Sequence, residues 1–116
     1  MKRRKKLDEP LAKFLFRQVI VGLGYLHKKN IIHRDIKLEN ILIDNEGIIK
    51  IADFGISKEI KPGTFIKERH MCGTPAYMSP EMIREKAPKY DGSTDVWATG
   101  VVLFVMVYGH LPFLGD

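Results

Sequence analysis

Two short runs of the sequence carry side chains that could transfer a phosphoryl group. The first, "HRDIKLEN", places a carboxylate at Asp35, an ammonium at Lys37 and an amide at Asn40, and the second, "ADFG", adds a carboxylate at Asp53. Carboxylate and amide oxygens suit Mg²⁺ bound together with phosphate. A lysine can offset charge on a moving phosphoryl group, and a carboxylate can accept the proton of the attacking hydroxyl. These residue types predict magnesium-dependent phosphoryl transfer.

The residues between the two runs predict a β-hairpin that would bring them together. Short β-branched runs at 41–43 ("ILI") and 48–51 ("IIKI") flank the turn-forming run "DNEG". Such a hairpin folds the chain back, so Asp53 would lie near Asp35 and Asn40. A salt-bridge cluster with a purely structural role is the alternative for "HRD" taken alone.

Two longer segments predict the helices that would position these residues. Apolar residues recur at spacings of three or four along Leu7–Lys28, and Pro10 stands in the first turn, which predicts an amphipathic helix. A final helix, capped by Ser93 or Thr94 and ending at Tyr108, is apolar nearly all round, which predicts a central buried helix.

The connection between the hairpin and the final helix shows no periodicity from residue 53 to residue 80, and a short helix is predicted at 80–85. A connection this long inside a compact domain is usually functional. The predicted fold class is therefore α+β, mainly helical, with a small β-hairpin.

The composition is that of a folded domain with a basic start. Of the 116 residues 45% are hydrophobic, which permits a buried core. The run "KRRKK" at 2–6 accounts for the whole net charge of +5 and is interpreted as a solvated tail, with a nuclear-import or nucleic-acid arm as the alternative. No stripe of aromatic and basic residues follows, so no nucleic-acid partner is expected.

Cysteine content and hydropathy bear on the compartment. Cys72 is the single cysteine, which excludes an internal disulfide and fits a reducing, intracellular compartment. The most apolar stretch, 101–108, is too short to span a bilayer, so no membrane span is expected. We expect a cytoplasmic protein, with the nucleus as the alternative.

Three motifs, in their order along the chain, resemble the eukaryotic protein kinases. "HRDIKLEN", "DFG" and "SPE" are similar to the catalytic loop, the metal-binding loop and the end of the activation segment of that family. The resemblance covers essentially the whole chain, 1–116, and implies the middle of a kinase C-terminal lobe. The lysine at 37 together with "GTPAY" follows the serine/threonine pattern. The run from residue 89 to residue 113 is most similar to the calcium/calmodulin-dependent and AMP-activated group.

The resemblance implies the chemistry of the two runs. Asp35 would be the catalytic base facing a Ser or Thr hydroxyl of a protein substrate, and Lys37 would contact the transferring phosphate of ATP. Asn40 and Asp53 would hold Mg²⁺ and thereby the nucleotide. Arg34 would pair with a negative charge on the activation segment.

The resemblance also implies the residues that support the site. Leu42 would touch the adenine from below, backed by Val102 and Met106 of the final helix. Phe54 would pack against His33.

Three further positions follow from the same resemblance. Asp95 would anchor the catalytic loop from the final helix. Thr74 would bridge the base and the lysine of the catalytic loop. The segment Gly73–Glu81 would form the wall for the substrate residue after the phosphorylated one.

The activation segment departs from the family pattern. His70 stands at the usual phosphorylated position, so Thr64 or Ser57 would be the phosphosite for an upstream activating kinase, or Glu68 would supply the charge instead. The arginine that pairs with Glu81 in the family has no counterpart in the sequence.

No Gly-rich loop and no "VAIK"-like lysine occur in the 116 residues, so we expect poor ATP binding and little activity from the chain alone. A truncated, non-catalytic kinase-like binding module is the alternative function. His27 and His110 are expected to be exposed at helix ends, whereas Leu42, Phe54 and Trp97 are expected in the core.

Overall fold

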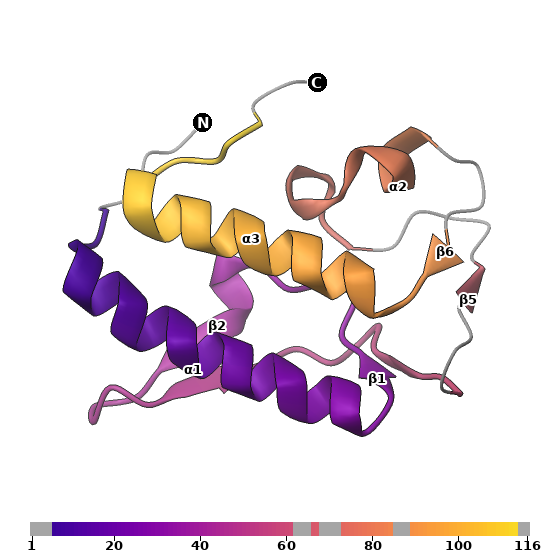
Figure 1. Cartoon of the computed structure of the whole chain (residues 1–116), viewed down its shortest axis with the longest axis horizontal. Helices are drawn as coiled ribbons and strands as arrows, with labels where there is room; N and C mark the ends of the chain where they lie inside the picture. Colours follow the sequence, from indigo (N-terminus) through magenta and orange to yellow (C-terminus); the bar gives the residue numbers. More distant parts are fainter. Residues whose placement is uncertain (1–5, 62–65, 68–72, 85–88, 114–116) are drawn as a thin grey trace.

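Two long helices lie side by side and organise the rest of the chain (Figure 1). The computed structural model describes residues 6–61, 66–67, 73–84 and 89–113. Helix α1 spans Glu9–Lys28 and helix α3 spans Gly92–Tyr108. They run antiparallel, because the Leu7 N–H donates to the Met106 carbonyl oxygen at one end (2.8 Å) and His27 contacts Asp95 at the other. The predicted α+β, mainly helical fold is confirmed.

Helix α1 begins with an N-cap, two residues after the predicted start. The Asp8 carboxylate accepts a hydrogen bond from the Leu11 N–H at 3.1 Å, and Pro10 occupies the first turn, where its missing N–H costs nothing. The helix ends at Lys28, and Asn30 adopts a left-handed conformation (φ 63°) that turns the chain toward the next strand. One side of the helix is buried, through Ala12, Leu15, Val19, Leu23 and Leu26.

The cap of helix α3 is Asp91, so the predicted caps Ser93 and Thr94 are wrong. Asp91 is extended, and its carboxylate accepts the Ser93 N–H at 2.9 Å, whereas Ser93 already lies inside the helix. The helix is also not buried on every side, since Val96 is 60% exposed. The apolar pattern therefore identified the helix but could not show which of its faces is covered.

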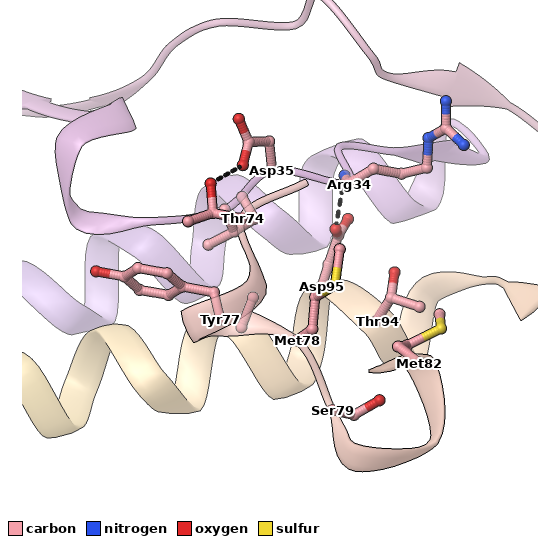
Figure 2. Close-up of a pocket in the computed structure, with 11 residues that line it drawn as sticks. Arg34, Asp35, Thr74, Tyr77, Met78, Ser79, Met82, Thr94 and Asp95 are labelled. Atoms are coloured by element: carbon pink, nitrogen blue, oxygen red, sulfur yellow. Dashed lines mark hydrogen bonds between the residues drawn. The ribbon is translucent and has the colours of Figure 1, made fainter. Parts of the chain in front are cut away.

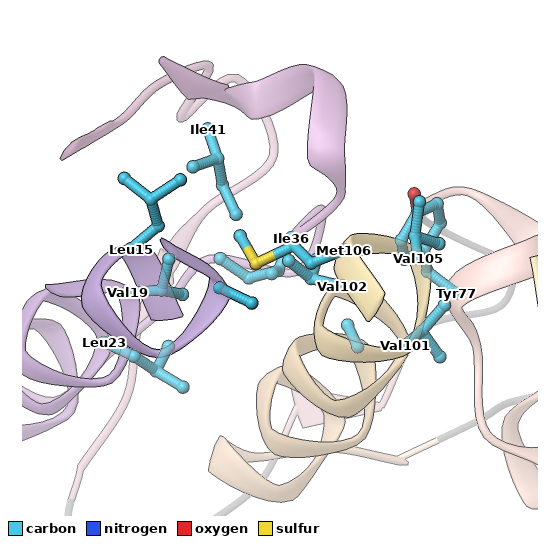
Figure 3. Packing of buried hydrophobic residues seen from close by; sticks show 12 residues of the cluster. Leu15, Val19, Leu23, Ile36, Ile41, Tyr77, Val101, Val102, Val105 and Met106 are labelled. Atoms are coloured by element: carbon cyan, nitrogen blue, oxygen red, sulfur yellow. The ribbon is translucent and has the colours of Figure 1, made fainter. Parts of the chain in front are cut away.

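The core lies between the two helices and the segments that carry Ile36, Ile41 and Tyr77 (Figure 3). Val19 of α1 and Val102 of α3 are both fully buried in this cluster. Ile36 joins it from a loop, Ile41 from a strand and Tyr77 from a short helical turn. Because residues on either side of Asp35 and Asn40 belong to the core, the polar side chains between them are held on a packed support.

The predicted hairpin is confirmed. Strands β2 (Ile41–Ile43) and β3 (Ile49–Ile51) pair antiparallel, and β3 begins one residue later than predicted. Asp44 shapes the turn, because its carboxylate accepts the N–H groups of Ile48 (3.0 Å) and Glu46 (2.8 Å). These two hydrogen bonds, Ile48 first, lower the pKa of the Asp44 carboxyl from its usual value.

Gln18 fastens the hairpin to helix α1. Its side-chain Nε2 donates to the Gly47 carbonyl oxygen and its Oε1 accepts the Ile49 N–H, both at 2.9 Å. On the same side of the helix, Gly22 allows the Ile51 side chain to approach closely, because an added Cβ would lie 3.1 Å from it. The hairpin therefore has both a polar and an apolar attachment.

We expect Gln18→Ala to lower the free energy of unfolding by about 1–3 kcal/mol, since it leaves two part-buried backbone groups without their partner. Urea unfolding followed by circular dichroism measures the change. Arg17→Ala, at an exposed position of the same helix, is the matched control and should change it by less than about 0.5 kcal/mol. Equal effects of the two substitutions would contradict the anchoring role.

The segment between the hairpin and α3 contains more regular structure than its sequence indicates. Strand β1 (Ile31–Ile32) pairs with β4 (Lys58–Glu59), and β5 (Ile66–Lys67) pairs with β6 (Lys89–Tyr90). These pairings join distant parts of the chain, so local periodicity cannot reveal them.

The described residues also form three short helical turns: η1 (Leu38–Asn40), η2 (Pro75–Tyr77) and α2 (Pro80–Arg84). Helix α2 matches the predicted helix at 80–85, except that residue 85 lies outside the described residues. Within the described part of the chain, no helix combines the length and the apolar character needed to cross a membrane.

Candidate active site

Asp95 holds the start of the "HRD" run from helix α3. Its buried carboxylate accepts the His33 N–H at 2.8 Å through Oδ2 and the Arg34 N–H at 2.9 Å through Oδ1. Arg34 has a φ of 73°, a conformation that non-glycine residues rarely adopt. The two hydrogen bonds stabilise this strained backbone. They thereby fix the orientation of the next residue, Asp35. The contact expected of Asp95 is present.

His27 also contacts this carboxylate, so the expectation that it is an exposed helix-end residue is wrong. Its Nε2 lies 3.0 Å from Asp95 Oδ2, and only 27% of its side chain is exposed. Gly92 packs against the ring, where an added Cβ would be 3.3 Å away. The two partners are 68 positions apart in the chain, so no local pattern could predict the contact.

Thr74 joins the carboxylate and the ammonium of the first run, and Figure 2 shows its hydroxyl bonded to Asp35. Its hydroxyl donates to Asp35 Oδ1 at 2.9 Å and accepts from Lys37 Nζ at 3.0 Å. Lys37 Nζ lies 3.7 Å from Asp35 Oδ2. The expected bridge is therefore present as a contact, and it aligns a proton acceptor and a cation side by side on a part-buried surface.

Asn40 lies beneath Asp35 at the start of the hairpin. Its buried amide nitrogen donates to the Asp35 carbonyl oxygen at 2.8 Å, which leaves the amide oxygen as the atom that a cation would use. Its own carbonyl oxygen accepts the Ala52 N–H at 2.8 Å, so the antiparallel pairing continues one step beyond β2 and β3. Asp53 follows that pair directly, as the hairpin prediction required.

Asp53 is exposed and has a left-handed backbone (φ 56°), and its Oδ1 accepts the Gly55 N–H at 3.3 Å. Within the described residues, no group of three or more His, Cys, Asp or Glu side chains could hold a metal. The Asp53 carboxylate and the Asn40 amide oxygen fit Mg²⁺ as two of its ligands. Phosphate and water oxygens would complete the coordination, as is usual for this ion.

His33 connects the two runs. Its Nδ1 accepts the Asp35 N–H at 3.1 Å, and its Nε2 lies 2.8 Å from the Ala52 carbonyl oxygen, so Nε2 carries the proton. The Phe54 ring meets the imidazole edge to face at 4.8 Å, as expected. Phe54 is nevertheless 43% exposed, so its assignment to the core is wrong.

Leu42 is likewise not a core residue, since it is 53% exposed. Successive side chains of a strand point to opposite faces, and in β2 the preceding residue, Ile41, takes the buried face. Val102 and Met106, which were expected to support Leu42, are buried in the cluster between the helices. The role of Leu42 toward a nucleotide stays a prediction.

Arg34 is buried, and its Nε donates to the Ile56 carbonyl oxygen at 2.7 Å, which ties the first run to the residues after "DFG". Nearby, the Ser57 hydroxyl donates to the Phe54 carbonyl oxygen at 2.9 Å. The pairing of Arg34 with an anionic activation segment stays a prediction. Other residues predicted for this region lie outside what is described: Thr64, Glu68, His70, Cys72 and the side chain of Glu81.

Two aromatic predictions need correction or refinement. His110 is half-buried rather than exposed, because its ring meets Phe104 edge to face at 5.6 Å. Trp97 packs against the core cluster and stacks on Phe113 at 6.2 Å. Within the described residues its buried indole N–H has no hydrogen-bond partner.

Gly73 shapes the contact between Thr74 and Asp35, whereas sequence reasoning assigned it only as the first residue of the substrate wall. It has a φ of 96°, and an added Cβ would lie 2.6 Å from the Arg34 carbonyl oxygen. This close approach brings the next residue, Thr74, against Asp35. A glycine directly before a threonine was the available signal, but its meaning depends on a contact 39 positions away.

Comparison with known proteins agrees with this geometry. The protein kinase domain family matches residues 1–116. "Probable serine/threonine-protein kinase MARK-A" of Dictyostelium discoideum is 49% identical over 111 residues, which are 95% of this chain and 10% of that protein. "Serine/threonine-protein kinase akt-2" of Caenorhabditis elegans is 47% identical over 97% of this chain and 21% of its own length. "NUAK family SNF1-like kinase 2" of Rattus norvegicus is 45% identical over 97% of this chain and 18% of its own length.

The chain thus spans between a tenth and about a fifth of the length of these relatives. They carry names from more than one kinase group at similar identity, so the narrower placement beside the calcium/calmodulin-dependent and AMP-activated group stays a prediction. The match over all 116 residues, the order of the motifs and the contacts among Asp35, Lys37 and Thr74 agree, and the chain belongs to the protein kinase domain family.

Proposed function

We propose that the chain is part of the catalytic domain of a serine/threonine protein kinase, which transfers the γ-phosphoryl group of ATP to Ser or Thr hydroxyls of proteins. The observation that carries the proposal is the bridge made by Thr74, which lies between the Asp35 carboxylate (2.9 Å) and the Lys37 ammonium (3.0 Å). Phosphoryl transfer depends mainly on positioning and on charge stabilisation, and this bridge supplies both.

Each residue of the site has a distinct task in this proposal. Asp35 orients the substrate hydroxyl and accepts its proton, while Lys37 offsets charge on the transferring group. Asn40 and Asp53 would hold Mg²⁺, which when bound neutralises the phosphate oxygens. His33, through its contacts with the Asp35 N–H and the Ala52 carbonyl oxygen, keeps the base and the metal-binding loop in register.

The substrate class and the regulation belong to the same proposal. The names of the relatives and the lysine two positions after Asp35 favour Ser and Thr hydroxyls over Tyr. Arg34 would receive a negative charge on the activation segment, placed there by an upstream kinase. A cytoplasmic location is proposed on the cysteine content alone.

We expect Asp53→Asn to weaken MgATP binding to the chain by about tenfold or more, since an amide replaces the charged ligand of the cation. Binding is measured by titrating labelled chain with MgATP and following amide resonances. Affinity should be low even for the unmodified chain, because no Gly-rich loop and no "VAIK"-like lysine occur in the 116 residues. Glu46→Gln, an exposed carboxylate at the tip of the same hairpin, is the control and should leave affinity unchanged.

Transfer itself is tested with radiolabelled ATP and pooled Ser/Thr and Tyr peptides. Any transfer to Ser/Thr peptides should fall at least about 100-fold in Asp35→Asn, since the base is lost while the shape is kept. Transfer that survives this substitution, or that prefers Tyr peptides, would refute the proposal.

A non-catalytic binding module is the second candidate, and the exposed apolar surface favours it. Val96 of α3 is 60% exposed and lines an apolar hollow on the surface together with Phe104 and Phe113. Exposed apolar surface of this kind often marks an interaction site. Stable co-purification with a kinase, together with no MgATP binding by the chain, would favour this module over the enzyme.

A further inference from the structure

Tyr77 is a buried tyrosine whose hydroxyl reaches the backbone of the "HRDIKLEN" run. The residue is 7% exposed and belongs to the same core cluster as Val101 and Val105 of α3 (Figure 3). The Leu38 N–H donates to the Tyr77 hydroxyl oxygen at 3.3 Å. A residue of η2 thus supplies an acceptor to the first residue of η1.

The Leu38 N–H needs a partner from outside its own turn. The first N–H groups of a helical turn have no acceptor within that turn. In η1 the Asn40 N–H already bonds to the Lys37 carbonyl oxygen (3.0 Å) and the Ile41 N–H to that of Leu38. Lys37, the N-cap, makes no side-chain cap hydrogen bond. The Tyr77 hydroxyl therefore takes the place of a cap.

The segment 74–77 touches the catalytic run at two separate points. Thr74 bonds the side chains of Asp35 and Lys37, and Tyr77 bonds the backbone of Leu38. The two contacts are linked by η2 itself, in which the Tyr77 N–H donates to the Thr74 carbonyl oxygen at 2.9 Å. One contact would leave η1 able to rotate against the segment, whereas two contacts fix its orientation.

We propose that Tyr77 is a positioning residue, whose hydroxyl sets the orientation of η1 and with it the directions of Lys37 and Asn40. The inference rests on the proposed function, because the consequence of that orientation is productive binding of MgATP. The hydrogen bond from the Leu38 N–H to the Tyr77 hydroxyl would also connect the two proposed sites, because Tyr77 belongs to the substrate wall and Leu38 lies between Lys37 and Asn40.

Tyr77→Phe removes the hydroxyl and keeps the ring. We expect this variant to bind MgATP about tenfold more weakly. Amide hydrogen exchange should accelerate at 38–40 only, while the core amides of Val19 and Val102 keep their protection. Tyr25→Phe, which removes an exposed hydroxyl from α1, is the matched control and should change neither quantity. Unchanged MgATP affinity in Tyr77→Phe, or acceleration spread evenly over the core, would overturn the proposal.

A double-mutant cycle tests whether the hydroxyl acts through Leu38. Leu38→Pro removes the donor, and proline suits the first position of the turn because Lys37 before it is already extended (φ −159°, ψ 164°). In the Leu38→Pro background, Tyr77→Phe should change MgATP affinity by less than about twofold. A tenfold loss that persists in this background would overturn the proposal, since Tyr77 would then act through another contact.

Failure of the proposed function gives a different pattern. If the unmodified chain binds no MgATP, the phosphoryl-transfer proposal fails, and the exchange data alone decide on Tyr77. Selective loss of protection at 38–40 would then support the positioning role, and unchanged exchange there would overturn it. The unmodified chain offers a check that needs no variant, because a Leu38 amide that exchanges as fast as an exposed one contradicts the hydrogen bond.

Discussion

Asp95→Asn is expected to lower the free energy of unfolding by about 3–5 kcal/mol, a large part of the stability of a small domain. The carboxylate accepts from three donors: Oδ2 from His33 and His27, and Oδ1 from Arg34. Asparagine keeps the shape but turns one oxygen into an N–H₂ group. In one orientation of the amide, its N–H₂ group faces the His33 N–H, and in the other it faces the Arg34 N–H. Either way one buried backbone N–H loses its acceptor.

The strained backbone at Arg34 adds to this cost. A residue held at a φ of 73° keeps that conformation only while its surroundings enforce it, and the hydrogen bond to Asp95 is part of that enforcement. We therefore expect faster amide exchange at His33 and Arg34 in Asp95→Asn even under conditions in which most of the chain remains folded.

The control for this prediction is Asp91→Asn, the same chemical change four positions earlier. Asp91 caps α3 through the Ser93 N–H, and asparagine caps helices about as well as aspartate. Its free energy of unfolding should change by less than about 1 kcal/mol. Urea unfolding of both variants measures the difference. A similar loss of unfolding free energy at the two positions would show that the Asp95 hydrogen bonds contribute no more to stability than the helix cap does.

The hairpin and the two long helices could be predicted because their signals are local. Apolar spacing along α1, the turn residues at Asp44–Gly47 and the β-branched runs beside them each act over a few residues. Hairpin geometry then placed Asp53 next to the pair formed by Asn40 and Ala52 without any knowledge of tertiary contacts.

The supporting contacts of the site could not be predicted, because they join residues far apart in the sequence. His27 looked like an ordinary basic residue at a helix end, yet its partner Asp95 is 68 positions away. Leu42 and Phe54 are apolar, and apolarity alone does not tell which face of a strand or loop is covered. The family resemblance supplied the Thr74 bridge, whereas the hydrogen bond from Leu38 to Tyr77 became visible only in three dimensions.

Gly73→Ala is expected to separate Thr74 from Asp35. In the proposed phosphoryl transfer, displacing a positioned group by about 1 Å would reduce any transfer by about 100-fold. The new Cβ would lie 2.6 Å from the Arg34 carbonyl oxygen, a backbone atom that cannot rotate away. Arg34 is held by Asp95 on its N–H and by Ile56 on its side chain, so the segment at 73–74 must move instead.

Two other glycines separate this clash from the general effects of an added methyl group. Gly47→Ala shares the positive φ (81°), but its Cβ would meet only a Phe14 side-chain atom at 3.5 Å, so it should cost about 1 kcal/mol of stability and leave the site intact. Gly24→Ala, inside α1 with nothing within 4 Å, should raise stability by about 0.5–1 kcal/mol.

The three variants are compared by urea unfolding and by the amide resonances of Asp35, Lys37 and Thr74. Only Gly73→Ala should shift those three resonances, because only there does the methyl group press on the backbone next to Asp35. If Gly73→Ala lost no more stability than Gly47→Ala and left the resonances in place, the close approach to Arg34 would not be what sets Thr74 against Asp35. The Thr74 bridge would then depend on Pro75–Tyr77 alone, where η2 packs into the core.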